Sequence, residues 1–163
     1  MRFPLVLALF SLTAAHAAAQ DALKIVDDGK TTAVVVVDPK AGKWEKQAAT
    51  DIVKYVELMS GAKLALADTD AAIAALKADA PQIVVGSAAL KADTTLQAAL
   101  DKVAKKEPTL RADAIALRRT GNRVLLAGTN DDSHYYAAAE LLRRWGCRWY
   151  LPTDIGEVVP EAK

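Results

Sequence analysis

Cysteine and histidine are almost absent from this sequence. Cys147 is the only cysteine in 163 residues, and His134 is the only histidine after residue 19. An intrachain disulfide is therefore excluded, and no ligand pair has the spacing of a known metal site. A cysteine nucleophile also needs a base in reach, so we predict that Cys147 is a small buried hydrophobic residue. We expect neither a metal nor any other cofactor.

An excess of charge of either sign is also missing. The sequence carries 21 lysines and arginines against 20 aspartates and glutamates, a formal net charge of +1. A nearly neutral chain offers no electrostatic reason to bind nucleic acid or an anionic membrane surface. Neither is expected as a partner.

No apolar run is long enough to cross a bilayer as a helix. The run from Phe3 to Leu12 follows the positive Arg2 and precedes three alanines at 17–19. This order predicts a signal peptide over residues 1–19, with a periplasmic or extracellular destination and no membrane contact after cleavage. The remaining residues, 20–163, number 144 and carry equal numbers of acidic and basic side chains. This length corresponds to one domain.

Short apolar runs bounded by glycine, proline and aspartate recur along the mature chain, and such runs predict strands. Turn residues at 27–30 and 120–122 each separate two of these runs, so we predict two β-hairpins. The predicted strands lie at 23–26, 33–37, 63–67, 82–85, 112–118 and 124–127, with a short aromatic strand after Gly146.

Helical periodicity alternates with these runs. It is clearest over residues 43–60, where apolar positions recur on one face and Gly61 follows as a C-terminal stop. Three further helical stretches are predicted. The first is capped by Asp68, Thr69 or Asp70 and reaches Ala78. The second is a mobile outer helix with loops between Gly86-Ser87 and Glu107-Pro108, and the third is capped by Asp131, Asp132 or Ser133 and ends at Gly146. The pattern predicts a single α/β domain with a mixed β-sheet of about seven strands and helices packed on it.

Two glycine turns from strand to helix are candidates for anion binding, Gly86-Ser87 and Gly128-Thr129-Asn130. Neither extends to a dinucleotide fingerprint or carries the lysine of a phosphate loop, so a nucleotide site is disfavoured. Acidic pairs suited to glycoside hydrolysis are disfavoured too, because the candidates stand in turns or caps. These candidates are Asp27, Asp28, Asp131, Asp132, Asp154 and Glu157.

Aromatic side chains gather near the C-terminus. Two of the three tryptophans and three of the four tyrosines lie between Ser133 and Pro160. Helical spacing puts Trp145 on the buried face, which indicates a structural role. Trp149 and Tyr150 are neighbours on a predicted strand, so one of them should face outward and mark a contact surface. We favour contact with another domain over a platform for sugar rings. The predicted contact residues are Trp149, Tyr150, Leu151, Pro152 and Ile155.

A resemblance to a known family rests on the C-terminal half. A hairpin and a glycine turn lead into YAAAELLRRWGCRW, of the form YAxxxLLxxxGxRW, and then into an ending of the form GxRWYxPxxxGEVxP. With the early strands and the helix before Gly61, residues 23–160 resemble the N-terminal accessory domain of secreted glycoside hydrolases, such as α-glucuronidases and family 20 β-N-acetylhexosaminidases. The matching positions are Gly128, Tyr136, Leu141, Leu142, Gly146, Arg148, Trp149, Tyr150, Pro152, Gly156 and Pro160.

The resemblance implies a hexosaminidase domain-2-like fold without catalytic residues, which packs on a catalytic (β/α)₈ barrel of the same protein. Such a barrel needs about 250 residues, and the sequence stops at Lys163, so we expect a fragment or truncation of a glycoside hydrolase. The expected function is a non-catalytic domain that supports the barrel. Two alternatives remain, a free-standing periplasmic carbohydrate-binding module that uses the C-terminal aromatics, and a small enzyme that uses Gly86-Ser87 or Gly128.

Overall fold

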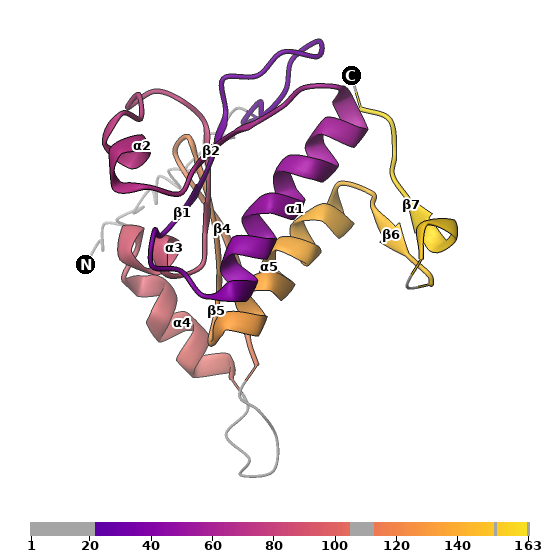
Figure 1. Cartoon of the computed structure of the whole chain (residues 1–163). Helices are drawn as coiled ribbons and strands as arrows, with labels where there is room; N and C mark the ends of the chain where they lie inside the picture. Colours follow the sequence, from indigo (N-terminus) through magenta and orange to yellow (C-terminus); the bar gives the residue numbers. More distant parts are fainter. Residues whose placement is uncertain (1–21, 105–112, 152, 163) are drawn as a thin grey trace, which may run out of the picture.

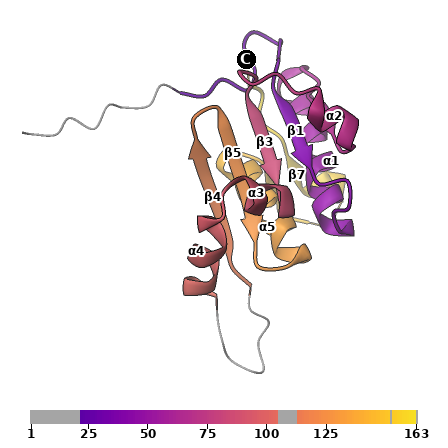
Figure 2. The ribbon, with the colours of Figure 1, turned by 90° about the vertical axis from the view of Figure 1, so that its left-hand side faces the viewer.

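The computed structural model describes residues 22–104, 113–151 and 153–162, with the side chain of Asp154 excepted. The predicted signal peptide, Glu107-Pro108 and the contact residue Pro152 lie outside the described residues. The described part is an α/β domain in which one sheet is covered by helices on both faces (Figures 1 and 2).

The sheet has five strands in the order β2-β1-β3-β5-β4. The first four run parallel, and β4 is antiparallel to β5, so the predicted mixed sheet is confirmed. Within the described residues the sheet has five strands where about seven were predicted, because residues 23–26 form no strand and the aromatic strand β6 pairs only with β7 in a separate ribbon. The strands are β1 (Val34–Val37), β2 (Ala65–Ala67), β3 (Gln82–Val85), β4 (Ile115–Thr120), β5 (Arg123–Gly128), β6 (Arg148–Trp149) and β7 (Glu157–Val158).

In the described part of the chain, five α-helices form the two outer layers, where three or four helices were predicted. Figure 2 shows α3 and α4 on one side of the sheet and α1 and α5 on the other. The helices are α1 (Lys43–Ser60), α2 (Asp70–Ala74), α3 (Ser87–Ala92), α4 (Thr95–Val103) and α5 (Asp131–Arg144). Alternate residues of each central strand point to opposite faces. Val35, Val37, Ile83 and Val85 therefore pack under α1 and α5, while Val36 and Val84 pack under the other three helices.

The first predicted hairpin is wrong. Asp27 and Lys30 do close a turn through backbone bonds of 2.9 and 3.0 Å, but residues 23–26 form no strand. Instead β1 is paired in parallel on both edges, with β2 and with β3. The uniformly apolar Val34–Val37 favours a central position, and both of its edges are already occupied. The second hairpin is confirmed as β4 and β5, joined at Gly121 with φ 58°.

The longest helix matches its prediction to the residue. It spans Lys43–Ser60, and Gly61 ends it in the left-handed conformation with φ 73°. The predicted helix up to Ala78 is shorter, because α2 ends at Ala74. The Asn122 amide binds the carbonyls of Ala78 and Ala80 at 3.1 and 2.9 Å, which holds that stretch as a turn beside the sheet. The outer region after Gly86 contains two helices, α3 and α4, in place of one.

Candidate functional site

Of the predicted contact residues, the described ones, Trp149, Tyr150, Leu151 and Ile155, lie on the ribbon that follows α5. Figure 1 shows β6 and β7 standing out from the α1–α5 layer, joined through the short helix η1 (Asp154–Gly156). Gly156 closes the loop, because its N–H donates to Thr153 at 2.9 Å and its carbonyl accepts from Tyr150 at 2.8 Å. A Cβ at Gly156 would lie 2.3 Å from the backbone nitrogen of Leu151, so this tight turn requires glycine.

Trp149 fastens the ribbon to α1. Its indole N–H lies 2.9 Å from the Tyr55 hydroxyl and 3.1 Å from Oε1 of Glu157, and its ring meets the Tyr55 ring edge-on with centroids 5.2 Å apart. The Tyr55 hydroxyl also donates to Glu157. Burial, together with this bond to a carboxylate, raises the pKa of Tyr55 to about 12. The same bond holds the pKa of Glu157 below its usual range, so Glu157 stays ionised and keeps accepting.

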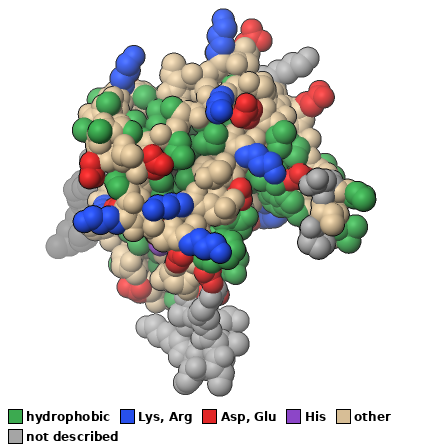
Figure 3. Space-filling model, in the orientation of Figure 1, with side chains coloured by type: hydrophobic (Ala, Val, Ile, Leu, Met, Phe, Trp, Pro, Cys, Tyr) green, Lys and Arg blue, Asp and Glu red, His purple; other side chains and the backbone are tan. Residues whose placement is uncertain are grey.

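The remaining large side chains of the ribbon face solvent. Tyr150 is 73% exposed, Leu151 57% and Ile155 92%, while Trp149 is 41% exposed despite its bonds. The expectation that one of the two neighbouring aromatics faces outward is met by Tyr150. Figure 3 shows hydrophobic side chains at the tip of this projection. The ribbon is thus an apolar surface held in a fixed position by hydrogen bonds to α1.

We predict that Trp149→Ala lowers the free energy of unfolding by about 1–2 kcal/mol, since it removes two hydrogen bonds and an aromatic pair. Tyr150→Ala is the matched control, because this neighbouring side chain is mostly exposed and should change stability by less than about 0.5 kcal/mol. Urea unfolding followed by circular dichroism measures both. Equal losses in the two variants would contradict the anchoring role of Trp149.

The outer surfaces of α1 and α5 form a groove of about 250 Å³ beside the ribbon, lined in part by Tyr55, Tyr135 and Trp149. The Tyr135 hydroxyl donates to Asp51 at 2.9 Å, and burial with this bond raises the pKa of Tyr135 to about 12. Trp44 packs on Tyr135 with ring centroids 5.5 Å apart. Both tyrosine hydroxyls are engaged inside the protein, so the groove presents mainly ring faces.

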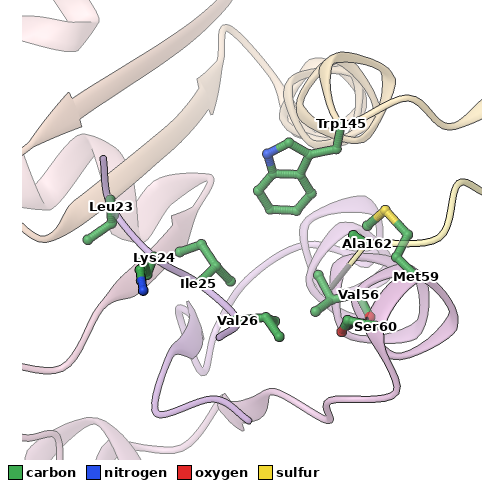
Figure 4. Close-up of a pocket in the computed structure, with 9 residues that line it drawn as sticks. All are labelled: Leu23, Lys24, Ile25, Val26, Val56, Met59, Ser60, Trp145 and Ala162. Carbon is green, nitrogen blue, oxygen red and sulfur yellow. Dashed lines mark hydrogen bonds between the residues drawn. The ribbon is translucent and has the colours of Figure 1, made fainter. Parts of the chain in front are cut away.

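A separate apolar pocket of about 300 Å³ lies between the N-terminal segment and the ends of α1 and α5 (Figure 4). The indole of Trp145 points into it, and Trp145 packs against the main core as predicted for a structural residue. The two polar side chains of the lining are engaged elsewhere, Ser60 with the Val56 carbonyl at 2.7 Å and Lys24 with Asp27 at 2.9 Å. Among the side chains that line this pocket, the Trp145 indole N–H is therefore the one polar group left to orient a ligand.

The turn at Gly86-Ser87 is filled by a side chain of the protein itself. Gly86 has φ 65°, and the N–H and hydroxyl of Ser87 donate to the Glu45 carboxylate at 3.1 and 2.9 Å. A Cβ on Gly86 would lie 2.5 Å from the Glu45 carboxyl carbon. The carboxylate therefore takes the place at the start of α3 where a bound phosphate would sit.

The N-termini of α1 and α5 lie at the same edge of the sheet and are also occupied by side chains of the protein. The Asp131 carboxylate accepts from the backbone N–H groups of Trp44 and Glu45 at 3.2 and 3.1 Å, so it caps α1. The N-cap of α5 is Asn130, whose side chain accepts from the Ser133 N–H at 3.0 Å while the Ser133 hydroxyl accepts from the Asn130 N–H at 2.8 Å. The predicted cap at Asp131, Asp132 or Ser133 is therefore one to three residues late, and Asp131 caps a different helix.

His134 completes a polar cluster with Glu45, which is buried, and with Ser87, which is partly buried. Its Nδ1 accepts from the Gly128 N–H at 2.8 Å, which requires that Nδ1 carry no proton, and its Nε2 lies 3.1 Å from Glu45 Oε1. The imidazole is therefore neutral, with its proton on Nε2 directed at the carboxylate. Burial lowers the pKa of His134, and the nearby carboxylates of Glu45 and Asp131 only partly oppose that effect.

The folded domain is predicted to lose stability as the pH falls below about 6.5, the ordinary pKa of histidine. The unfolded chain binds a proton there that the folded His134 refuses, so acid favours unfolding by up to about 1.4 kcal/mol per pH unit. Urea unfolding of wild type and His134→Gln between pH 7.5 and 5 measures this. His134→Gln should have a lower free energy of unfolding than wild type at pH 7.5, but this free energy should change less between pH 7.5 and 5. If the free energies of both proteins fell in parallel with pH, His134 would not be the group responsible.

Cys147 is fully buried, with its sulfur 3.9 Å from that of Met59. Burial raises the pKa of the thiol, which keeps it protonated. The prediction of a small buried hydrophobic residue is confirmed.

Neither a metal centre nor a membrane span is found in the part of the chain that the structure describes. In that part no three His, Cys, Asp or Glu side chains are placed to hold a metal ion together. Likewise, none of the described helices combines the length and apolar character needed to cross a bilayer.

Sequence reasoning missed the cluster of Glu45, Ser87 and His134. Two signals could have indicated it. Glu45 is an acid in the first turn of a helix that follows a central strand, and His134 falls on the apolar face of its own helix. Their contact depends on how the strands are ordered in the sheet, which local patterns do not specify.

Comparisons with protein-family models, with curated proteins and with solved structures gave no match for this chain. The resemblance to glycoside hydrolase accessory domains therefore stays a prediction.

Proposed function

We propose that this chain is a non-catalytic docking domain of an exported carbohydrate-active protein, and that its ribbon packs against a catalytic (β/α)₈ barrel. The observation that carries the proposal is the exposure of Tyr150, Leu151 and Ile155 on a ribbon that hydrogen bonds hold in place. Ordered, contiguous apolar surface of this kind is typical of a protein interface.

The polar groups of the domain support a docking role over a reaction centre. Glu45 and His134 are buried, Ser87 is partly buried, and both Ser87 and His134 are bonded to the Glu45 carboxylate, while Asp131 is used as a helix cap. In a nucleophilic triad the histidine would touch the serine, whereas here the carboxylate lies between the two. The arrangement stabilises the junction of α1, α3 and α5, and it offers no activated nucleophile.

The proposed class of the parent protein rests on the resemblance of the ending GxRWYxPxxxGEVxP, and of the helix before it, to glycoside hydrolase accessory domains. The hexosaminidase domain-2-like fold, the barrel in cis, the glycoside hydrolase activity of the parent and the export signal all belong to this proposal. In an accessory domain of this kind the ribbon lies where the chain leads toward the barrel, and the exposed side chains at 150, 151 and 155 would be covered there.

A carbohydrate-binding module is the second candidate. The observation in its favour is the groove beside the ribbon, where the rings of Trp149 and Tyr135 are accompanied by the Asp51 carboxylate. Aromatic faces with a polar neighbour suit a sugar ring, and the groove is near the lower size limit of small-molecule pockets, about 300 Å³.

Tryptophan fluorescence of the purified chain separates the two candidates. Neutral, acidic and N-acetylated oligosaccharides are titrated against wild type and Trp149→Ala. The docking proposal expects no saturable change up to about 10 mM, corresponding to a binding free energy weaker than about 3 kcal/mol. A saturable quench that is lost in Trp149→Ala would overturn it in favour of the carbohydrate module.

A further inference from the structure

A cleft of about 550 Å³ lies on the face of the sheet opposite α1 and α5, between α2 and α3. It is larger than the groove beside the ribbon and falls within the range of small-molecule pockets, about 300–1,000 Å³. The sheet provides its floor through Val36 and Val84. The walls combine charged side chains, among them Asp70 at the start of α2, with apolar ones from α2, from the turn after it and from α3, namely Ile73, Leu76, Ala88 and Ala92.

Gln82 is the unusual residue of this cleft. It is only 6% exposed, and it lies two residues before Val84 on β3, so its side chain is directed to the same face. Among the residues that the structure describes, none hydrogen-bonds the side-chain amide of Gln82, and the polar atoms of this side chain are accessible from the cleft. A ligand in the cleft can therefore reach the Gln82 side-chain amide and form a hydrogen bond with it.

Two cations lie at the same end of the cleft as Gln82. Arg123 on β5 is directly paired in register with Gln82, and Lys77 follows α2. Within the described ranges neither side chain takes part in an ion pair, whereas Lys91 at the other end is paired with Asp38. The cleft therefore has one end with uncompensated positive charge and an amide donor, and an apolar middle.

We propose that this cleft binds a small organic monocarboxylate with an apolar body. The carboxylate lies against the Arg123 guanidinium, a planar donor suited to two parallel hydrogen bonds, and accepts a further bond from the Gln82 amide. The hydrocarbon body packs on Val36, Val84 and the walls. Inorganic phosphate would leave those walls in contact with water, and a sugar would place hydroxyl groups against them without partners.

This site is independent of the docking surface. Figure 2 shows α2 and α3 in front of the sheet, with α1, α5 and β7 behind it. A ligand in the cleft and a partner on the ribbon can therefore be bound at the same time, and each proposal can fail alone.

Sodium hexanoate is the probe, titrated into ¹⁵N-labelled protein and followed by amide chemical shifts. Acetate has the charge without the body, and hexan-1-ol has the body without the charge. The variants Arg123→Gln and Gln82→Met remove the two proposed contacts. Arg119→Gln is the matched control, because Arg119 is on the same hairpin but alternates with Arg118, on the strand face opposite to the cleft.

Hexanoate should give saturable shifts confined to β3, α2, α3 and the start of β5, and both control compounds should bind at least about tenfold more weakly. Arg123→Gln should weaken hexanoate binding about tenfold, as expected for a lost charge-assisted hydrogen bond. Gln82→Met should weaken it about threefold, and Arg119→Gln should leave it unchanged. Equal binding of hexan-1-ol, shifts located on the ribbon, or unchanged binding in both cleft variants would overturn the proposal.

Discussion

Replacement of Glu45 by alanine is expected to reduce the free energy of unfolding by about 3 kcal/mol or more. The Glu45 carboxylate accepts hydrogen bonds from the N–H and hydroxyl of Ser87 and from His134. Without it the buried His134 donor and the two donors of the partly buried Ser87 have no partner, and each unpaired buried group costs about 1–3 kcal/mol. The substitution also removes the free-energy cost of desolvating a buried carboxylate, but this gain offsets only part of that loss.

Urea unfolding at pH 7.5 measures the effect of Glu45→Ala. Glu57→Ala is the matched control, because Glu57 is an exposed acid on the same helix and its loss should change stability by less than about 0.5 kcal/mol. If Glu45→Ala were as mild as Glu57→Ala, the three-residue cluster could not be holding α1, α3 and α5 together.

The substitution Gly128→Ala, which adds a single methyl group, should strongly destabilise the domain. A Cβ at this position would lie 2.3 Å from the backbone carbon of Ser133 and 2.6 Å from the backbone nitrogen of His134. Those atoms belong to the first turn of α5 and cannot move aside as a flexible side chain can. We expect a loss of more than about 3 kcal/mol, at the upper end for overpacking, with much of the protein unfolded.

Gly121→Ala is the control for Gly128→Ala, because it introduces backbone strain without a steric clash. Gly121 has φ 58°, but a Cβ there would meet nothing within 4 Å. Its variant should lose only about 1–2 kcal/mol, the ordinary cost of a left-handed residue with a side chain. Thermal unfolding of both variants tests the contact, and similar midpoints would mean that β5 and α5 are not as close as the structure places them.

Local patterns predicted the elements whose own sequence fixes their ends. Helix α1 combines a regular apolar face with Gly61 after its last turn, and β3 is a short apolar run between Pro81 and Gly86. Both were predicted to the residue. The predicted strand at 23–26 was wrong because the pairing of β1 is not decided locally. It depends on β2 and β3, which lie far away in the sequence.

The candidate site was predictable in its exposed part only. Tyr150, Leu151 and Ile155 follow a helix stop and carry apolar side chains in an irregular segment, which is enough to expect a contact surface. The anchoring by Tyr55 was not predictable, because Tyr55 is 94 residues away from Trp149 and falls on the apolar side of α1. The cleft at Gln82 and Arg123 was missed for a similar reason, since only the register of β3 and β5 brings them together.

Sedimentation velocity of the purified chain over about 10 µM to 1 mM tests most directly whether the ribbon is a docking surface. An uncovered apolar patch favours weak self-association at these concentrations. Wild type should sediment faster as concentration rises, and the triple variant Tyr150→Ser, Leu151→Ser, Ile155→Ser should stay monomeric. Val103→Ser, which alters a 66% exposed apolar residue on α4, should behave like wild type. A wild-type chain that is strictly monomeric at 1 mM, or a triple variant that associates equally, would contradict the account.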